Sequence, residues 1–250
     1  MSGMPLLMLW LRREARLRWP ALLACCLLMA ITSATVLTAV AGARRGASTV
    51  TRLLAVTRPA TAEVVPNEPG FDWNRIRALP EVEALTTFPA YTGLPTDVAP
   101  ANAPNPFVPA DTEAMRTIET PVVLVGRLAD PARPDEAVVT PAFVRSTGRG
   151  VGDTVTARLT TPAQASASVN TGLDAKPAGP TVRLRIVGVI RSLWYGDDIG
   201  GRGSLIPSAG LFARYRANFL GAAGEVPLNA IIRLRGGGPA CPRSAPTWPA

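Results

Sequence analysis

The clearest candidate for chemistry in this sequence is a pair of neighbouring acids, Asp197 and Asp198. They follow Trp194-Tyr195-Gly196 and precede Gly200-Gly201, a context that is typical of a loop. Two carboxylates on one loop could bind Ca²⁺ or act as general acid and base. Because no further acid stands nearby with the spacing of a Ca²⁺-binding loop, we interpret the pair as part of a solvated hairpin loop. We therefore predict no catalytic and no metal-binding residue here.

A second candidate is the glycine-rich stretch Gly148-Arg149-Gly150-Val151-Gly152-Asp153. Its glycine content is that of a nucleotide-binding loop, but its spacing is not G-x-G-x-x-G, and it precedes a predicted strand instead of a helix. The phosphate-binding pattern G-x-x-x-x-G-K-[ST] occurs nowhere in the sequence. We interpret the stretch as a turn and expect no cofactor.

The residue types themselves exclude several kinds of active site. The sequence has no histidine, which excludes Ser-His-Asp and Cys-His nucleophilic sites and metal sites built on histidine. Cys25 and Cys26 lie inside an apolar run and Cys241 in a proline-rich end, so no disulfide framework is indicated. We predict that the chain is not an enzyme; an anchored hydrolase using Asp197 and Asp198 is the alternative that this composition leaves.

The charge balance is basic, with 26 Lys and Arg against 18 Asp and Glu and a formal net charge of +8. Lys176 is the single lysine, and the arginines are scattered without a run of five basic residues. A basic chain can bind nucleic acid or anionic lipid. Since an apolar run is also present, we expect membrane lipid as the partner and no nucleic acid.

The elements that must position any site begin with that apolar run. Residues 19–43 carry no charge, and Arg18 stands before the run while Arg44 and Arg45 follow it. As a helix, residues 21–43 would be roughly 34 Å long, and a bilayer has a hydrocarbon core about 30 Å thick. The pattern predicts a transmembrane helix over 20–43, with Arg18, Trp19, Arg44 and Arg45 at the membrane interfaces.

Two other interpretations of the first 45 residues stay open. Ala39-Val40-Ala41 and Ala41-Gly42-Ala43 both fit the cleavage site of a secretory signal peptide, and Leu22-Leu23-Ala24-Cys25 loosely fits a lipoprotein signal. A signal peptide usually has an apolar region of about 7–15 residues, and this one is longer. The length therefore favours a retained membrane helix.

The remaining chain divides by composition into a leading segment, a large domain and a tail. Residues 1–19 mix leucines with arginines and predict a cytoplasmic amphipathic segment, helical over 4–17. Residues 44–235 predict an extracytoplasmic domain, although the arginines on the two sides of the span are almost balanced. Residues 236–250, with Gly236-Gly237-Gly238 and four later prolines, predict a disordered or aberrant tail.

Within the domain, short strands and short helices follow one another without a repeat. Helical spacing predicts that the first helix continues over 47–56 until Pro59, and Asp72 is a predicted N-cap. Further helices are expected over 141–147 and 208–219, the latter with Leu211, Phe212, Tyr215 and Phe219 on one face. We expect strands over 62–65, 82–88, 122–125, 137–140, 154–160, 181–190 and 228–234, and loops over 95–110 and 162–180. Together, these expected helices and strands make an α+β domain with mixed strands.

Several phrases, taken in order, resemble a known family, the FtsX-like (MacB-type) permeases of ABC transporters. They are Arg18-Trp19-Pro20-Ala21-Leu22 before the span, Ala41-Gly42-Ala43-Arg44-Arg45 after it, Ala78-Leu79-Pro80-Glu81-Val82-Glu83-Ala84, Val125-Gly126-Arg127 with Arg133-Pro134-Asp135-Glu136-Ala137-Val138-Val139, Val151-Gly152-Asp153-Thr154-Val155, and Arg185-Ile186-Val187-Gly188-Val189-Ile190. Together they cover roughly residues 10–235.

The resemblance implies a plasma-membrane protein with a cytoplasmic N-terminus and a MacB-like periplasmic core domain outside the cytoplasm. It also implies other permease copies and a separate ATPase subunit as partners, and no catalytic residue in the permease itself. Such permeases have further membrane helices after this domain, and no later apolar run here is long enough to span. We interpret the chain as a truncated or frame-shifted permease component; the alternative is a single-pass or secreted binding or scaffold module.

Overall fold

The structure is a computed structural model, and it describes residues 4–91, 93–99, 103–171, 176–192, 194–195 and 201–236. The chain separates into two compact units, residues 1–53 and residues 54–250. Asp197, Asp198 and Cys241 lie outside the described residues, as does nearly all of the predicted tail. The two units are described one at a time below.

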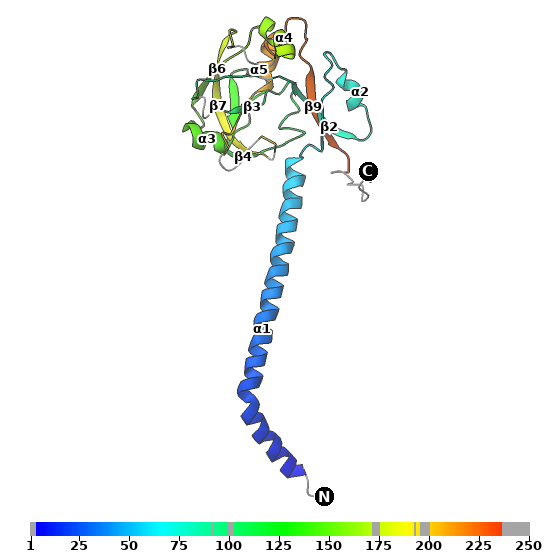
Figure 1. The fold of residues 1–250 in the computed structure, drawn as a ribbon, viewed down its shortest axis with the longest axis vertical. Coiled ribbons are helices and arrows are strands. Elements are labelled where there is room, and N and C mark those ends of the chain that lie inside the picture. The colour runs from blue at the N-terminus through cyan, green and yellow to red at the C-terminus, as the bar shows by residue number, and fades with distance from the viewer. Residues whose placement is uncertain are drawn as a thin grey trace, which may run out of the picture. The chain divides into compact units, whose positions relative to one another are not determined.

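The first unit is the greater part of one helix, α1 (Met4–Thr57), which Figure 1 shows in blue and cyan. Residues Arg18–Gly46 are long and apolar enough to cross a membrane, with a mean hydropathy of 2.2 and no part of that stretch buried. Threonines inside it bond within the helix, since the hydroxyls of Thr32, Thr35 and Thr38 donate to carbonyls one turn earlier. A polar side chain satisfied in this way suits a hydrocarbon environment.

The helix is continuous through both ends of that apolar stretch. It includes Pro20 near its N-terminal third, and Figure 1 shows α1 bending in its blue part, as helices do at an internal proline. The prediction that the helix continues beyond the span is confirmed, because α1 ends at Thr57, two residues before Pro59.

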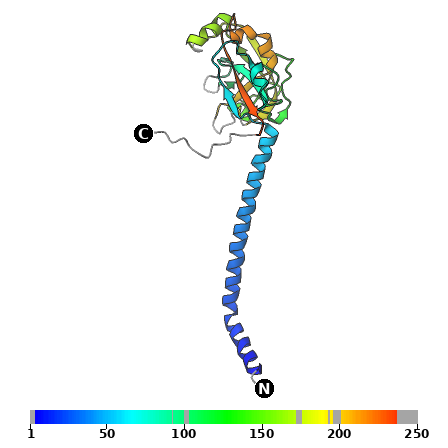
Figure 2. The same ribbon diagram turned by 90° about the vertical axis from the view of Figure 1, so that its right-hand side faces the viewer.

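The second unit contains two sheets, of which the smaller has the order β1-β9-β2. β9 (Leu228–Leu234) lies between β1 (Ala62–Val64) and β2 (Val82–Pro89) and pairs with both in antiparallel fashion (Figures 1 and 2). α2 (Trp73–Arg77) packs on this sheet and begins where predicted, with the Asp72 carboxylate accepting a bond of 3.0 Å from the Asn74 amide. Trp73, Val82, Leu85, Ala230 and Ile232 form its core.

The larger sheet has six strands and mixes parallel with antiparallel pairs. Its members are β3 (Asn105–Pro106), β8 (Ser204–Pro207), β5 (Glu136–Val139), β7 (Thr181–Arg191), β4 (Val122–Gly126) and β6 (Thr154–Arg158). The long strand β7 pairs parallel with β5 on one side, and antiparallel with β6 and β4. This arrangement confirms the predicted α+β class with mixed strands.

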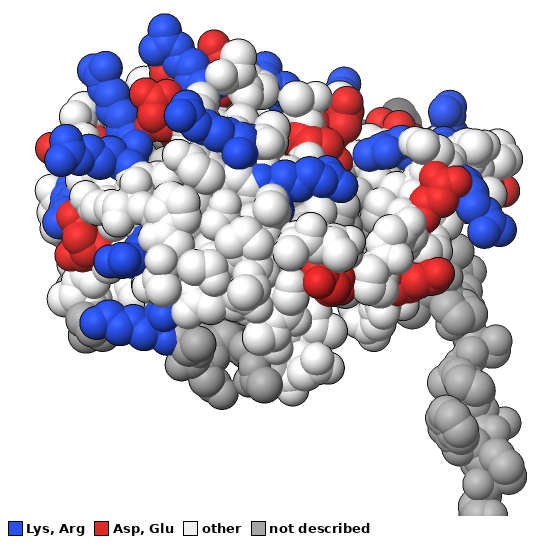
Figure 3. All heavy atoms as spheres, turned by 90° about the horizontal axis from the view of Figure 1, so that it is seen from above, with Lys and Arg blue, Asp and Glu red and all other residues white. Residues whose placement is uncertain are grey.

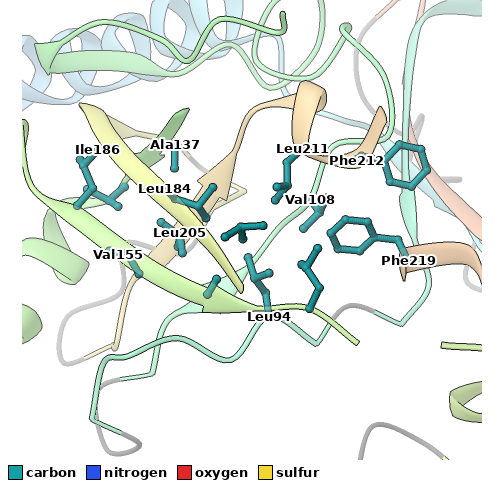
Figure 4. Close-up of a cluster of buried hydrophobic side chains, with 14 of the residues drawn as sticks. Leu94, Val108, Ala137, Val155, Leu184, Ile186, Leu205, Leu211, Phe212 and Phe219 are labelled. Carbon is teal, nitrogen blue, oxygen red and sulfur yellow. The ribbon is translucent and has the colours of Figure 1, made fainter. Parts of the chain in front are cut away.

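Four short helices complete the second unit: α3 (Pro141–Thr147), α4 (Pro162–Thr171), α5 (Ala209–Arg214) and α6 (Arg216–Leu220). Figure 4 shows the main core, where Val155, Leu184 and Leu205 of the sheet face side chains of α5 and α6. Leu211, Phe212 and Phe219 are buried there and Tyr215 packs against them, so the predicted apolar face is a core face.

Four sequence predictions differ from the structure. Residues 162–180 were predicted as a loop, but α4 occupies the first ten of them. The helix predicted over 208–219 is two helices, because Tyr215 has φ −117° and ψ 33° and interrupts the helical geometry. Strand β8 had no counterpart among the predicted elements, and β3 lies in the predicted loop 95–110 and pairs with β8.

Candidate functional site at the helix exit

The residues predicted at the membrane interfaces all lie on α1. Arg18 and Trp19 stand at one end of its apolar stretch and Arg44 and Arg45 at the other, and Trp19 is 60% exposed. Their positions on the helix follow from the sequence, and their contact with lipid headgroups stays a prediction. Cys25 and Cys26 are exposed on the same stretch.

The residues considered for chemistry form no reactive site in the described part of the chain. The turn Gly148–Asp153 bonds to the sheet instead, with the Gly152 amide donating to the Ile186 carbonyl at 2.9 Å and the Ile186 amide donating to the Asp153 carbonyl at 2.8 Å. Of the residues that the structure describes, no three His, Cys, Asp or Glu side chains are grouped so as to hold a metal ion. The turn is structural.

A different group of polar residues gathers where the chain leaves α1, at Arg58–Thr61, which we call the helix exit. Thr57 is buried, and Arg58 has a φ of +43°, a left-handed conformation that non-glycine residues rarely adopt. This turn ends the helix, and strand β1 follows it. Strained conformations of this kind persist only where surrounding bonds hold them.

Glu119 supplies part of those bonds, from the loop before β4. One of its carboxylate oxygens accepts a bond of 2.6 Å from the Ala60 amide, and its own backbone amide donates to the Arg58 carbonyl at 3.0 Å. The other carboxylate oxygen accepts from the Ser192 hydroxyl at 3.4 Å. Glu119 is 2% exposed and also has a left-handed backbone, with φ +51°. One side chain thus ties the exit to the segments next to β4 and β7.

Burial dominates the electrostatics of Glu119. Removal from water raises the pKa of its carboxyl, and the bonds from Ala60 and Ser192 together with the charge of Arg233 oppose that rise without cancelling it. The folded protein therefore holds a proton on Glu119 more tightly than an exposed glutamate would.

The smaller sheet also bonds to the exit, through Arg233 of β9 and through the backbone of β9 next to Thr61. The Arg233 guanidinium donates to the Pro59 carbonyl at 3.1 Å and to the Glu83 carboxylate at 3.0 Å. The Thr61 amide donates to the Ile232 carbonyl at 2.8 Å, and its hydroxyl accepts from the Leu234 amide at 2.9 Å. The exit residues are therefore bonded to strand β9 of the smaller sheet and to Glu119 in the loop before β4.

The polar groups at the helix exit are engaged with one another. Both oxygens of the Glu119 carboxylate are occupied by protein donors, and the Arg233 guanidinium is shared between a carbonyl and a carboxylate. The sequence analysis did not identify Glu119 or Arg233. The one available signal was an acid placed between Ile118 and the apolar run that begins at Val122.

Two of the phrases quoted above each supply a glycine to the contact between β4 and β7. Gly126 in β4 lies opposite Gly188 in β7, and Gly126 has φ +76°. A Cβ on Gly126 would lie 2.2 Å from the Val187 carbonyl oxygen, and one on Gly188 would lie 2.1 Å from the Arg127 carbonyl oxygen. The close approach of β4 to β7 therefore requires both glycines.

The phrase that includes Gly126 also supplies an ion pair between Arg127 and Glu136. Arg127 binds Glu136 through two bonds, of 2.7 and 2.5 Å, and the buried Glu136 carboxylate also accepts from the Asp130 amide at 3.0 Å. The bonds from Arg127 lower the pKa of Glu136. The phrase thus joins the end of β4 to the start of β5.

Charges elsewhere on the second unit are distributed. Figure 3 shows acidic side chains among the basic ones around one face, with uncharged residues across its middle. Several are paired, as in Arg149–Asp97 at 2.7 Å and Arg77–Asp111 at 3.5 Å. Basic and acidic side chains are therefore mixed on this surface, and some of them form local ion pairs.

Comparison with known proteins gave matches at the level of structure. No protein-family model matches the sequence, and no curated protein matches it. Among solved structures, the chain is similar to the extracellular domain of the ABC-type transporter YknZ of Gram-positive bacteria, with a TM-score of 0.41 and 8% identity over 68% of this chain and 75% of that one. It is also similar to a domain assigned to a permease protein of Porphyromonas gingivalis, with a TM-score of 0.40 and 16% identity over 68% of this chain and 69% of that one.

Proposed function

We propose that this chain is a membrane-embedded permease component of an ABC transporter, of the FtsX-like or MacB-like kind, with no chemistry of its own. In this proposal the apolar part of α1 spans the plasma membrane with its N-terminus in the cytoplasm. The second unit lies outside the cytoplasm and follows the movements of the helix, which a separate ATPase subunit drives.

The observation that carries the proposal is the continuity of α1 with a bonded exit. The helix runs without a break from the apolar stretch Arg18–Gly46 to Thr57, and the exit residues that follow are bonded to β9 and to Glu119 in the loop before β4. A flexible tether would need no such bonds. A helix that must pass a displacement to a domain needs a stiff connection, and Glu119 and Arg233 supply one.

The positions of the family phrases support the same proposal. Strands β4, β5 and β7 depend on four residues of these phrases. The close approach of β4 to β7 needs Gly126 and Gly188, and the bonds between Arg127 and Glu136 join β4 to β5. These residues are therefore explained by the fold that they stabilise. A family whose permeases have no catalytic residues would share residues for this kind of reason.

Labelling of single cysteines tests the topology. In a variant with Cys25→Ala, Cys26→Ala and Cys241→Ser, we add Ser2→Cys or Val151→Cys, the latter in a turn where the side chain is 45% exposed. A membrane-impermeant maleimide should label Val151→Cys on intact cells, and Ser2→Cys only after permeabilisation. The reverse pattern, or labelling of both on intact cells, would contradict the proposal.

Photolabelling tests the coupling to an ATPase. The chain purified from native membranes in mild detergent should bring with it a second protein that azido-ATP labels, because the chain itself has no phosphate-binding loop. A preparation in which no companion protein takes the label would argue against the transporter assignment while leaving the topology result intact.

A second candidate, a binding module at the cell surface, is favoured by one observation. An open groove of about 290 Å³ lies beside β2 and is lined by Arg77, Val82, Glu83, Ala84, Leu85, Asp111 and Glu113. N-terminal sequencing of the expressed protein separates the candidates. A mature chain starting at Gly42 or Arg44 would favour a secreted module, and an intact N-terminus would favour the permease component.

A further inference from the structure

A pocket on the second unit combines two arginines with hydroxyl groups, and we call it the arginine pocket. It is open to solvent and has a volume of about 190 Å³. Three segments form its walls: the start of β7, the turn before β5 and the end of α5. Its lining includes Asp135, Thr181, Val182, Arg183, Arg214 and Tyr215.

Hydrogen bonds hold these three walls to one another. The Arg185 amide of β7 donates to the Asp135 carbonyl at 2.7 Å, which joins the strand to the turn. The Ser208 amide, directly before α5, donates to the Glu136 carbonyl at 2.9 Å, and the Ser208 hydroxyl donates to the Arg133 carbonyl. The walls are therefore in place without a ligand, so binding does not have to order the backbone first.

Neither guanidinium of the arginine pocket is neutralised by an acid. Within the described residues, Arg183 and Arg214 form no ion pair, and the Asp135 carboxylate binds neither of them although it lines the same pocket. The neighbouring Arg133, by contrast, is paired with Glu136 at 3.6 Å. Two unpaired guanidinium groups and one carboxylate leave the arginine pocket with a net positive charge.

An aromatic ring holds the Arg214 guanidinium. Its central carbon lies 5.6 Å from the centre of the Tyr215 ring, which is a cation–π distance. Tyr215 is half-buried and packs against the main core. A guanidinium that stacks through its face keeps its N–H groups free at its edge, and these match the two oxygens of a carboxylate or phosphate.

The solvent face of β6 and β7 adds positive charge and no negative charge. Because Val155, Ala157, Val182 and Leu184 are buried, the residues that alternate with them face solvent. These outward residues are Thr154, Thr156, Arg158, Thr181, Arg183 and Arg185. An anion that approaches the pocket from this face meets arginines and hydroxyl groups, which favours its local accumulation.

The groove beside β2 has the opposite charge. Its arginine, Arg77, is paired with Asp111 at 3.5 Å, and Glu83 and Glu113 also line it. The acids therefore outnumber the arginine there, and that groove does not suit an anion.

We propose that the arginine pocket binds a small oxyanion ligand, a molecule that presents a carboxylate or phosphate group to Arg183 and Arg214. The Thr181 and Tyr215 hydroxyls are further donors in the lining. The volume is below the roughly 300–1,000 Å³ of a site for a drug-sized molecule, so the ligand is a small anion or the charged end of a larger molecule. The inference rests neither on membrane anchoring nor on an ATPase, so its failure would leave the proposed function unaffected.

Arginine footprinting of the full-length chain in a non-ionic detergent tests the proposal. p-Hydroxyphenylglyoxal modifies exposed arginines, and peptide mass spectrometry reports the rate at each one. At constant ionic strength, inorganic phosphate or succinate should slow the modification of Arg183 and Arg214 several-fold. The rates at Arg75 and Arg216, which are exposed outside the pocket, should not change. Arg216 is the matched control, since its guanidinium carbon lies 5.7 Å from the centre of the Phe212 ring.

Three substitutions show whether the protection comes from the pocket. Arg214→Gln should raise the anion concentration that half-protects Arg183 by about 10-fold or more, because it removes charge-assisted bonds. Arg216→Gln should leave that concentration unchanged. Asp135→Asn should lower it, because it removes a carboxylate that repels the bound anion. Damage to the fold could not tighten binding, so Asp135→Asn keeps the test decisive even if circular dichroism shows that Arg214→Gln is misfolded.

The possible results separate cleanly. Protection by only one of the two anions supports the proposal and identifies the oxyanion as phosphate or carboxylate. No protection of either pocket arginine by either anion would overturn the proposal, and so would equal protection of Arg75 and Arg216, which would mean general screening of charge. Protection of Arg183 that neither Arg214→Gln nor Asp135→Asn alters would also overturn it.

Discussion

Glu119 combines an unfavourable environment with favourable bonds. Its carboxylate is buried, which raises its pKa, and yet it accepts from the Ala60 amide and from the Ser192 hydroxyl. A neutral amide in the same place could keep the bond to Ala60 without the cost of burying a charge. Substitutions of Glu119 can therefore separate the effect of the hydrogen bond to Ala60 from the effect of the buried charge.

Two substitutions test this separation in the full-length chain in detergent. Glu119→Ala leaves the Ala60 amide without its acceptor and should lower the free energy of unfolding by about 1–3 kcal/mol. Glu119→Gln should be at least as stable as the unmodified chain at neutral pH, because it keeps an acceptor and removes the buried charge. Thermal or denaturant unfolding followed by circular dichroism measures both, and equal losses in the two variants would show that the bond to Ala60 is not what matters.

The pH dependence of the same variants has a definite sign. Because the pKa of Glu119 is raised on folding, its contribution to stability is fully present below the pKa of the unfolded chain and declines as pH rises through the folded pKa. The difference in stability between the unmodified chain and Glu119→Gln should therefore shift in favour of the glutamine as pH rises through that range. A difference that does not change with pH would contradict the account of the buried carboxyl.

A second prediction concerns the single residue Gly126. Gly126→Ala places a methyl group against the Val187 carbonyl at a residue with φ +76° and should cost at least about 2 kcal/mol. Gly150→Ala is the matched control, since a Cβ there meets nothing within 4 Å and its φ is not left-handed. Unfolding of the two variants side by side gives the result, and similar stabilities would refute the claim that β4 and β7 need this glycine.

Among single residues, those with a local role were predictable and those with long-range partners were not. Asp72 was correctly identified as an N-cap because the cap bonds to an amide two residues away. Glu119 and Arg233 were not identified, since their partners lie 59 and 174 residues away in sequence at Ala60 and Pro59. No pattern of spacing in the sequence encodes such contacts.

Among the elements, the connection from β4 to β5 is bonded through the buried Glu136 carboxylate, which is contacted by Arg127, Arg133 and the Asp130 amide. Arg127 binds the buried Glu136 carboxylate and lowers its pKa, so this pair stabilises the fold above the ordinary glutamate pKa and loses its effect as pH falls through the lowered value. The sign is opposite to that of Glu119.

Arg127→Met should therefore destabilise the chain at neutral pH, and the deficit should shrink in acid as Glu136 becomes protonated in both proteins. Arg183→Met is a control on β7, because Arg183 is an exposed arginine on the solvent face of the strand. Unfolding midpoints across the pH range measure the effect. A deficit that is constant with pH would mean that Arg127 acts through packing alone.

The elements that the sequence predicted well are those with clear periodicity. β7 was expected over 181–190 and extends over Thr181–Arg191, because Val182, Leu184 and Ile186 alternate with exposed residues. α4 was missed because its composition is that of a loop. Its start nevertheless has a capping box, in which the Thr161 amide donates to the Gln164 side chain at 3.0 Å and the Gln164 amide donates to the Thr161 hydroxyl at 3.1 Å. With Pro162 at the first helical position, that signal was present in the sequence.

β8 shows the other kind of failure. Its four residues, Ser204–Pro207, are all buried, and the strand is held between β5 and β3. A strand that is buried on both faces has no alternation to detect, and four residues are too few for a recognisable apolar run. Its existence follows from tertiary pairing alone.

For the whole molecule, the sequence was sufficient to predict the apolar helix and the class of the following domain. The 25 uncharged residues from Trp19 to Ala43 give the helix directly, and the structure extends it to Thr57. The helix exit could not be predicted, because it brings together residues from the end of α1, the loop before β4 and strand β9.

The central claim is that the apolar stretch of α1 resides in a bilayer and remains part of the chain. Alkaline carbonate extraction of membranes from cells that express the full-length chain tests it most directly. We expect the chain to stay in the membrane pellet at its full mass of 26.2 kDa, since Arg18–Gly46 has no buried surface of its own and a mean hydropathy of 2.2. Recovery of the chain in the carbonate supernatant, whether intact or shortened to a start near Gly42, would contradict the account.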